Sequence, residues 1–119
     1  MKEAILYHPL ENSEVRCELC GHFCRIREGR RGRCGVRENR QGRLYSLVYG
    51  HLVAEHIDPI EKKPLFHVLP GSLSYSISTV GCNFHCKHCQ NASISQPGRF
   101  EGDHPPGVLR SPTDVVEAA

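Results

Sequence analysis

Seven cysteines in a chain of 119 residues constrain its structure more than any other feature of the sequence. An odd number of cysteines cannot all pair as disulfides, and the spacing divides the seven into a group of four and a group of three. The first group has the pattern C-x2-C-x3-C-x9-C and consists of Cys17, Cys20, Cys24 and Cys34. The second has the pattern C-x3-C-x2-C and consists of Cys82, Cys86 and Cys89. The fold must therefore accommodate two separate groups of thiols.

The sequence predicts neither a targeting segment nor a membrane-spanning segment. Its first residues lack the basic stretch and long apolar run of a signal peptide. No apolar run approaches the roughly 20 residues that cross a bilayer. We therefore expect a cytoplasmic protein without membrane contact. In such a reducing compartment, clustered cysteines bind metals more often than they form disulfides.

Eleven glycines and eight prolines predict many loops around a small core. Residues 44–57 contain two short β-like runs divided at Gly50, and residues 73–80 alternate with the period of a strand. Residues 93–110 are expected to form a polar loop. Ser111 and Pro112 predict the start of a helix, with Asp114 in its first turn. We expect the chain to end inside that helix, as the first part of a larger protein.

The three-cysteine group directly follows the strand expected at 73–80 and predicts an open metal site. Three thiolates cannot close a tetrahedral zinc site, so zinc would need a fourth ligand such as His85 or His88. A [4Fe–4S] cluster takes one cysteine per iron, so three cysteines leave one iron free for another ligand. An open coordination position is typical of a reactive site. The spacing alone leaves both metals as alternatives.

The segment GCNFHCKHCQN at 81–91 resembles the cluster loop of the radical S-adenosylmethionine (SAM) superfamily. Together with CELCGHFC at 17–24, GRRGRCGVR at 29–37, DPIEKKPLFH at 58–67 and PGS at 70–72, it is similar to the AmmeMemoRadiSam-system radical SAM enzymes. These in turn resemble the pyruvate formate-lyase activating enzymes. The likeness covers nearly the whole chain. It implies that Cys82, Cys86 and Cys89 hold a [4Fe–4S] cluster, with SAM as a ligand of the fourth iron. His88 stands where the family usually has an aromatic residue near the adenine.

The resemblance also implies a fold class and two domains. The class is α/β, and residues 73–119 would form the first strand, cluster loop and helix start of a partial (β/α)6 radical SAM barrel. A small β-rich subdomain with a four-cysteine metal site would precede it at residues 1–72.

The activity implied by the resemblance is reductive cleavage of SAM to a 5′-deoxyadenosyl radical, which abstracts a hydrogen atom. No catalytic side chain is predicted beyond the cofactor ligands. The implied partners are SAM, an electron donor of the flavodoxin or ferredoxin type, and a macromolecular substrate such as a glycine of a partner enzyme. We expect residues 1–119 alone to be inactive, because the segments that complete the SAM pocket are missing from them.

The four-cysteine group can close a tetrahedral metal site by itself. Gly21 follows Cys20 and permits the tight turn of a zinc knuckle. Thiolates suit both zinc and a second iron–sulfur cluster, so the spacing leaves the metal open. His22 is expected to be a turn residue rather than a ligand.

An arginine-rich stretch follows, with eight arginines and two glutamates between residues 25 and 43. A basic stretch beside a zinc knuckle also occurs in nucleic-acid-binding modules. The alternative function is therefore a non-catalytic zinc-binding module that contacts nucleic acid or protein through these arginines. No aromatic residue is interleaved for base stacking, which favours a solvated face instead.

In the segment from 58 to 67, an exposed hinge is favoured over a site lined by Asp58, Glu61, Lys62, Lys63 and His67.

Overall fold

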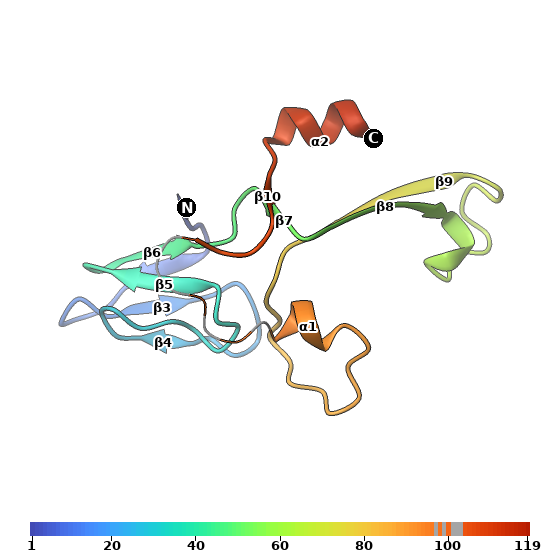
Figure 1. Cartoon of the computed structure of the whole chain (residues 1–119). Coiled ribbons are helices and arrows are strands. Elements are labelled where there is room, and N and C mark those ends of the chain that lie inside the picture. The colour runs from blue at the N-terminus through green and yellow to red at the C-terminus, as the bar shows by residue number, and fades with distance from the viewer. Residues whose placement is uncertain (97, 99, 101–103) are drawn as a thin grey trace.

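The computed structural model describes residues 1–96, 98, 100 and 104–119, and short antiparallel strands dominate it (Figure 1). Two three-stranded sheets form the N-terminal part. β3 lies between β2 and β4 in one sheet, and β6 lies between β1 and β5 in the other. The strands are β1 (Lys2–Glu3), β2 (Tyr7–Pro9), β3 (Val15–Cys17), β4 (Arg25–Ile26), β5 (Arg37–Arg40) and β6 (Arg43–Ser46).

The hydrophobic core joins these two sheets. It consists of buried residues from both, namely Ala4, Val15, Cys17, Ile26 and Leu44. Strand alternation places them there, because Val15 and Cys17 face inwards from β3 while the residue between them is exposed. The core is therefore small, and one of the predicted metal ligands belongs to it.

A tight turn connects β5 to β6. Gln41 has a φ of +54° and Gly42 has a φ of +81°, and a two-residue hairpin turn of type I′ requires positive φ at both positions. The turn fixes the register, with Arg40 opposite Arg43.

A long hairpin projects away from the two sheets (Figure 1). It pairs β8 (Ala54–Pro59) with β9 (Leu73–Ser78) over six residue pairs, from Ala54 opposite Ser78 to Pro59 opposite Leu73. A short 3₁₀ helix, η1 (Ile60–Lys62), follows β8 at the tip. There the backbone N–H of Gly71 donates a hydrogen bond to the Glu61 carboxylate at 2.8 Å.

The remaining elements are small. β7 (His51–Leu52) pairs with β10 (Val108–Leu109), and the two helices are α1 (Ala92–Ser95) and α2 (Pro112–Ala118). The helix start predicted at Ser111 is confirmed, because Ser111 and Asp114 form a reciprocal capping box. In the part of the chain that is described, no helix has the length and apolarity needed to cross a membrane.

The predicted fold class, the α/β start of a partial (β/α)6 radical SAM barrel, is wrong. Every strand pair described is antiparallel, and the two helices have only four and seven residues. A parallel βαβ unit needs a crossover of a dozen or more residues, usually a helix. The strand expected at 73–80 does form, as β9, but its partner is the preceding strand β8. The alternating pattern identified a strand without identifying its neighbour.

The β-like runs divided at Gly50 are confirmed as β6 on one side and β7 and β8 on the other. The segment from 58 to 67, expected to be an exposed hinge, instead contains the end of β8, the 3₁₀ helix η1 and part of the hairpin tip. The predicted boundary between residues 72 and 73 therefore falls inside one hairpin. The loop expected at 93–110 includes most of α1, and its residues 97, 99 and 101–103 lie outside the described part of the chain.

Candidate metal-binding site

The four cysteines of the first group lie at the ends of the core strands. Cys17 ends β3, Cys24 directly precedes β4, and Cys20 lies in the loop between these strands. Cys34 lies in the loop that leads to β5. The Cys17 backbone N–H donates a hydrogen bond to the Cys24 carbonyl at 2.9 Å, which closes the loop at its base. All seven cysteines of the chain are free thiols and thus available as ligands.

A cavity of about 510 Å³ brings the two cysteine groups together. Its wall contains the whole first group and the first member of the second: Cys17, Cys20, Cys24, Cys34 and Cys82. Within residues 1–96, 98, 100 and 104–119, however, no three His, Cys, Asp or Glu side chains converge as they do around a metal ion. The thiols therefore line the cavity without meeting at one point.

Gly81 brings the second group up to the first. Its φ is +99°, and a Cβ at this position would lie 2.5 Å from Cγ1 of Val36 and 3.1 Å from the carbonyl oxygen of Cys34. The Gly81 N–H also donates a hydrogen bond to the carbonyl of Ile94 in α1 at 2.9 Å. Only a residue without a side chain fits between these neighbours, so Gly81 holds Cys82 beside the Cys34 loop.

A second contact joins the two groups. Nε2 of His22, in the loop between β3 and β4, lies 2.7 Å from the carbonyl oxygen of Asn83. The ring nitrogen must donate here, because a carbonyl oxygen only accepts. The prediction of His22 as a turn residue omitted this hydrogen bond across 61 positions of sequence. His22 thus links the predicted zinc knuckle to the predicted cluster loop.

The predicted cluster loop at 81–91 follows β9, and its cysteines lie in different surroundings. Cys82 is half-buried, and its Sγ accepts a hydrogen bond from the backbone N–H of Phe84 at 3.4 Å. Cys86 is exposed. The Sγ of Cys89 lies 3.2 Å from Oγ of Ser95 in α1. His88 is exposed on the same loop.

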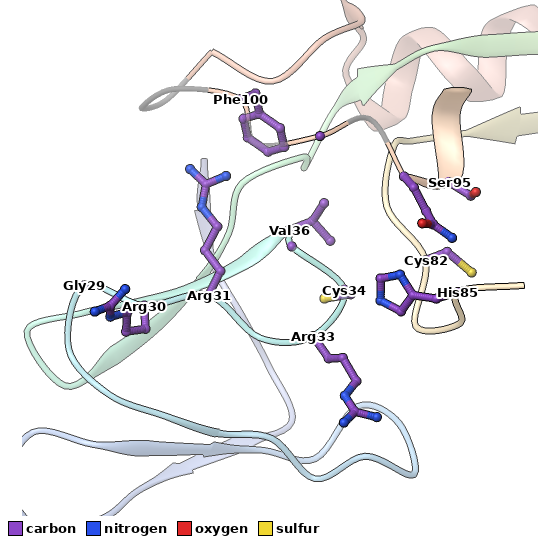
Figure 2. A pocket seen from close by; sticks show the side chains of 13 residues that line it. Gly29, Arg30, Arg31, Arg33, Cys34, Val36, Cys82, His85, Ser95 and Phe100 are labelled. Atoms are coloured by element: carbon purple, nitrogen blue, oxygen red, sulfur yellow. The ribbon is translucent and has the colours of Figure 1, made fainter. Parts of the chain in front are cut away.

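A second cavity, of about 520 Å³, also has Cys34 and Cys82 in its wall (Figure 2). Arginines and His85 enter its wall, and the labelled basic residues are Arg30, Arg31, Arg33 and His85. The sequence did not predict that these residues lie near the segment at 81–91. No spacing signal could have done so, because the contact joins loops about 50 residues apart in the chain.

Arg37 is a buried charged residue in direct contact with the first cysteine group. It is only 8% exposed, and it lines the same cavity as the four thiols. Its Nη1 donates to the Sγ of Cys17 at 3.2 Å and its Nη2 donates to the carbonyl of Ile5 at 3.1 Å. Among the described residues, no carboxylate forms an ion pair with Arg37. The arginine-rich stretch predicts a solvated face, and that prediction is wrong for Arg37.

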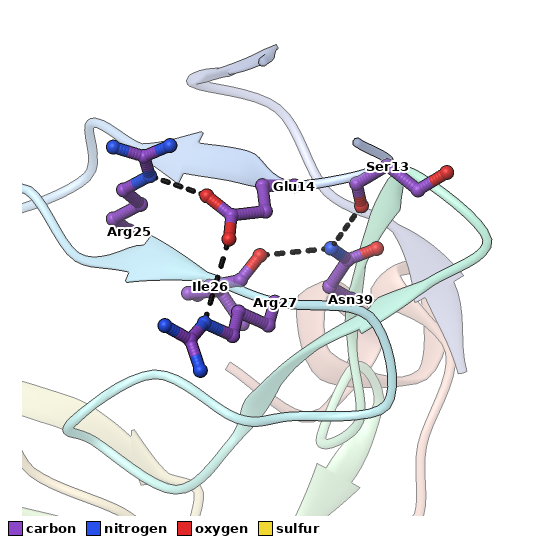
Figure 3. A network of polar contacts seen from close by, with 6 residues as sticks. All are labelled: Ser13, Glu14, Arg25, Ile26, Arg27 and Asn39. Atoms are coloured by element: carbon purple, nitrogen blue, oxygen red, sulfur yellow. Dashed lines mark hydrogen bonds and ion pairs between the residues drawn. The ribbon is translucent and has the colours of Figure 1, made fainter. Parts of the chain in front are cut away.

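Much of the remaining arginine charge is used in ion pairs within the fold. Glu14 pairs with Arg25 and with Arg27 (Figure 3). Glu38 accepts hydrogen bonds from Arg31 and Arg40, each at 2.8 Å. Partial burial alone would raise the pKa of Glu38, but these two hydrogen bonds outweigh it and hold the pKa below its ordinary value. These ion pairs reduce the basic surface that is free to bind nucleic acid.

The charged residues at 58–67 lie at the hairpin tip rather than around the cysteines. Lys62 donates a hydrogen bond to Asp58 at 2.8 Å, and this contact lowers the pKa of the Asp58 carboxyl group. Lys63 and His67 are exposed. None of these residues lines the two cavities described above.

Comparisons with known proteins give relatives but no function. No protein family model and no solved structure match the chain. It is 47% identical to uncharacterized protein MJ0808 of Methanocaldococcus jannaschii over all 119 residues, which are 35% of that protein. It is 36% identical to uncharacterized protein MJ0674 of the same organism over 87 residues, covering 72% of this chain and 21% of that protein. The chain thus spans about a third or less of the length of these curated relatives.

Proposed function

We propose that this chain supplies the cluster-binding part of a radical SAM enzyme. Cys82, Cys86 and Cys89 would hold a [4Fe–4S] cluster. The observation that carries the proposal is the C-x3-C-x2-C loop, whose three free thiols directly follow strand β9. The strand and loop remain as expected although the fold around them differs from the predicted barrel.

The chemistry of the donor set fits this cluster. Three thiolates can bind three of the four irons and leave the fourth for SAM. The N–H of Phe84 points at the Sγ of Cys82, and hydrogen bonds of this kind to the sulfurs help to set a cluster's reduction potential. When bound, such a cluster supplies an electron for reductive cleavage of SAM.

Within this proposal, some residues around the loop at 81–91 would position the loop and others would contact SAM. Gly81 and His22 hold the start of the loop against the cysteine-rich sheet, where Cys82 is partly shielded from water. His88 is exposed and therefore accessible to the adenine of SAM, the contact that the resemblance assigns to its position.

An electron donor of the flavodoxin or ferredoxin type belongs to the same proposal. Arg30 and Arg33 are exposed beside Cys34 and Cys82, and neither forms an ion pair within the described residues. Unpaired positive charge at this place favours association with an acidic protein. A macromolecular substrate would likewise bind near the cluster.

Anaerobic reconstitution with iron and sulfide tests the proposal. We expect the reduced full-length enzyme that the proposal implies to give an iron–sulfur absorption band and an electron paramagnetic resonance signal that changes when SAM is added. Cys86→Ala should abolish the SAM-dependent change, whereas the matched variant Cys20→Ala in the first group should retain it. A colourless protein, or an unchanged SAM response in Cys86→Ala, would contradict the assignment.

A further inference from the structure

The projecting hairpin of β8 and β9 has one apolar face and one polar face. Residues opposite each other in an antiparallel pair point to the same face, and the two faces alternate along each strand. The register therefore gathers apolar and aromatic side chains on one face, namely Ile57, Pro59, Leu73, Tyr75 and Ile77. The Tyr75 hydroxyl donates a hydrogen bond to the Glu55 carboxylate at 2.7 Å across this face, which agrees with that arrangement. The other face carries mostly serine, together with His56 and Asp58.

The apolar face is uncovered in the part of the chain that the structure describes. Ile57 is 63% exposed, Leu73 is 70% exposed and Ile77 is 48% exposed. Antiparallel sheets with this alternation commonly pack the apolar face on a core and leave the polar face in water. A two-stranded hairpin is also only marginally stable by itself, and packing against a further strand or a helix stabilises it. The face therefore indicates a covering element that lies outside the described residues.

The size of the face decides between a second copy of the chain and a covering segment of the same polypeptide. Each strand contributes six residues. At a rise of roughly 3.3 Å per residue and a spacing of about 4.8 Å between strands, the face measures on the order of 200 Å². A stable complex between two proteins buries about 800 Å² on each partner. The face is thus too small to hold a separate protein, whereas a tethered segment packs on it without the loss of translational and rotational freedom.

We propose that the apolar face of the β8–β9 hairpin is a docking surface for a further segment of a longer polypeptide, of which residues 1–119 are a part. The relatives have the necessary length, because the 119 residues that match MJ0808 are only 35% of that protein. The segment that fits is an apolar strand or the apolar side of a helix. Glu55 is the charged residue of the face, and its carboxylate is already engaged by Tyr75 and by Arg110, the latter at 3.4 Å.

Hydroxyl-radical footprinting of the full-length protein tests the proposal. It depends on neither iron nor SAM, so its failure is distinct from a failure of the proposed function. We expect the side chains of Ile57 and Leu73 to be oxidised several-fold more slowly in the full-length protein than in residues 1–119. Oxidation of His56, on the polar face, should be the same in both forms. Equal oxidation of the apolar face in both forms, or a protein without residues beyond these 119, would overturn the proposal.

A pair of substitutions gives a second readout. Ile57→Thr keeps the β-branched shape and introduces a hydroxyl group. It should lower the urea midpoint of the full-length protein and leave that of residues 1–119 nearly unchanged, because Ile57 is exposed there. The matched variant His56→Thr should leave both midpoints nearly unchanged. An equal effect of Ile57→Thr on both forms would overturn the proposal. A full-length dimer that Ile57→Thr dissociates in analytical ultracentrifugation would place a second copy on the face and would also overturn it.

Discussion

Asn39 is a buried polar side chain that links the two N-terminal sheets. It is fully buried in β5. Its Nδ2 donates hydrogen bonds to the carbonyls of Ser13 at 2.7 Å and Ile26 at 2.8 Å (Figure 3). Its Oδ1 accepts a hydrogen bond from the Gly42 N–H at 2.9 Å. One side chain thus joins β4, the β5–β6 turn and the turn before β3.

Asn39→Ala should lower the free energy of unfolding by about 3 kcal/mol, because it removes three hydrogen bonds worth about 1 kcal/mol each. The carbonyl of Ile26 lies in a nearly inaccessible residue, so water cannot replace its lost donor. Asn39→Asp should cost more than Asn39→Ala, since a carboxylate cannot donate to either carbonyl and would bury a charge. The effect belongs to the fold and does not depend on any metal ligand.

Urea unfolding of the reduced, metal-free chain measures these differences without any contribution from metal binding. Asn91→Ala is the matched control, because Asn91 is exposed and its side chain makes no capping hydrogen bond at α1. We expect the control to change stability by less than about 0.5 kcal/mol. A loss below about 1 kcal/mol in Asn39→Ala, or a more stable Asn39→Asp, would refute the reasoning about buried hydrogen bonds.

Two further predictions concern Glu38 and Gly81. The pKa of Glu38 is lower in the folded state than its ordinary value of 4.5. Ionised Glu38 therefore stabilises the folded state fully above pH 4.5. This stabilisation is lost as the pH falls through the lower, folded-state pKa. Glu38→Gln should therefore flatten the acid side of the stability curve measured by urea unfolding, and an unchanged curve would contradict this. Gly81→Ala should cost about 1–3 kcal/mol more than Gly71→Ala, because both positions have positive φ but only the Cβ at 81 meets Val36. Equal urea midpoints would contradict this steric argument.

Local features of the fold could be predicted from the sequence because their causes are local. The serine alternation of β9 and the Ser111 capping box each depend on a few neighbouring residues, and both appear where expected. The pairing of β9 with β8 depends on the hairpin between them, which the proline-rich sequence at 58–72 did not identify. The barrel expected from the resemblance is wrong because β9 pairs antiparallel with β8.

The candidate site could likewise be predicted from the sequence only in part. The spacing predicted that the four cysteines of the first group belong together, and they line one cavity. The presence of Cys82 in that cavity could not be predicted, because it follows from the fit of Gly81 against Val36. The burial of Arg37 could not be predicted either, since one arginine among eight carries no mark of its position in the alternation of β5.

The projecting hairpin has a consequence for handling the protein. In the described residues β8 and β9 pair only with each other, so each leaves its outer edge of N–H and C=O groups without a strand neighbour. Apolar side chains are exposed along the hairpin, with Ile57 at 63%, Leu73 at 70% and Phe66 at 61%. Open edges with apolar neighbours template pairing with other chains and hence aggregation. A lysine in place of Ile57 would protect this edge while leaving both cysteine groups untouched.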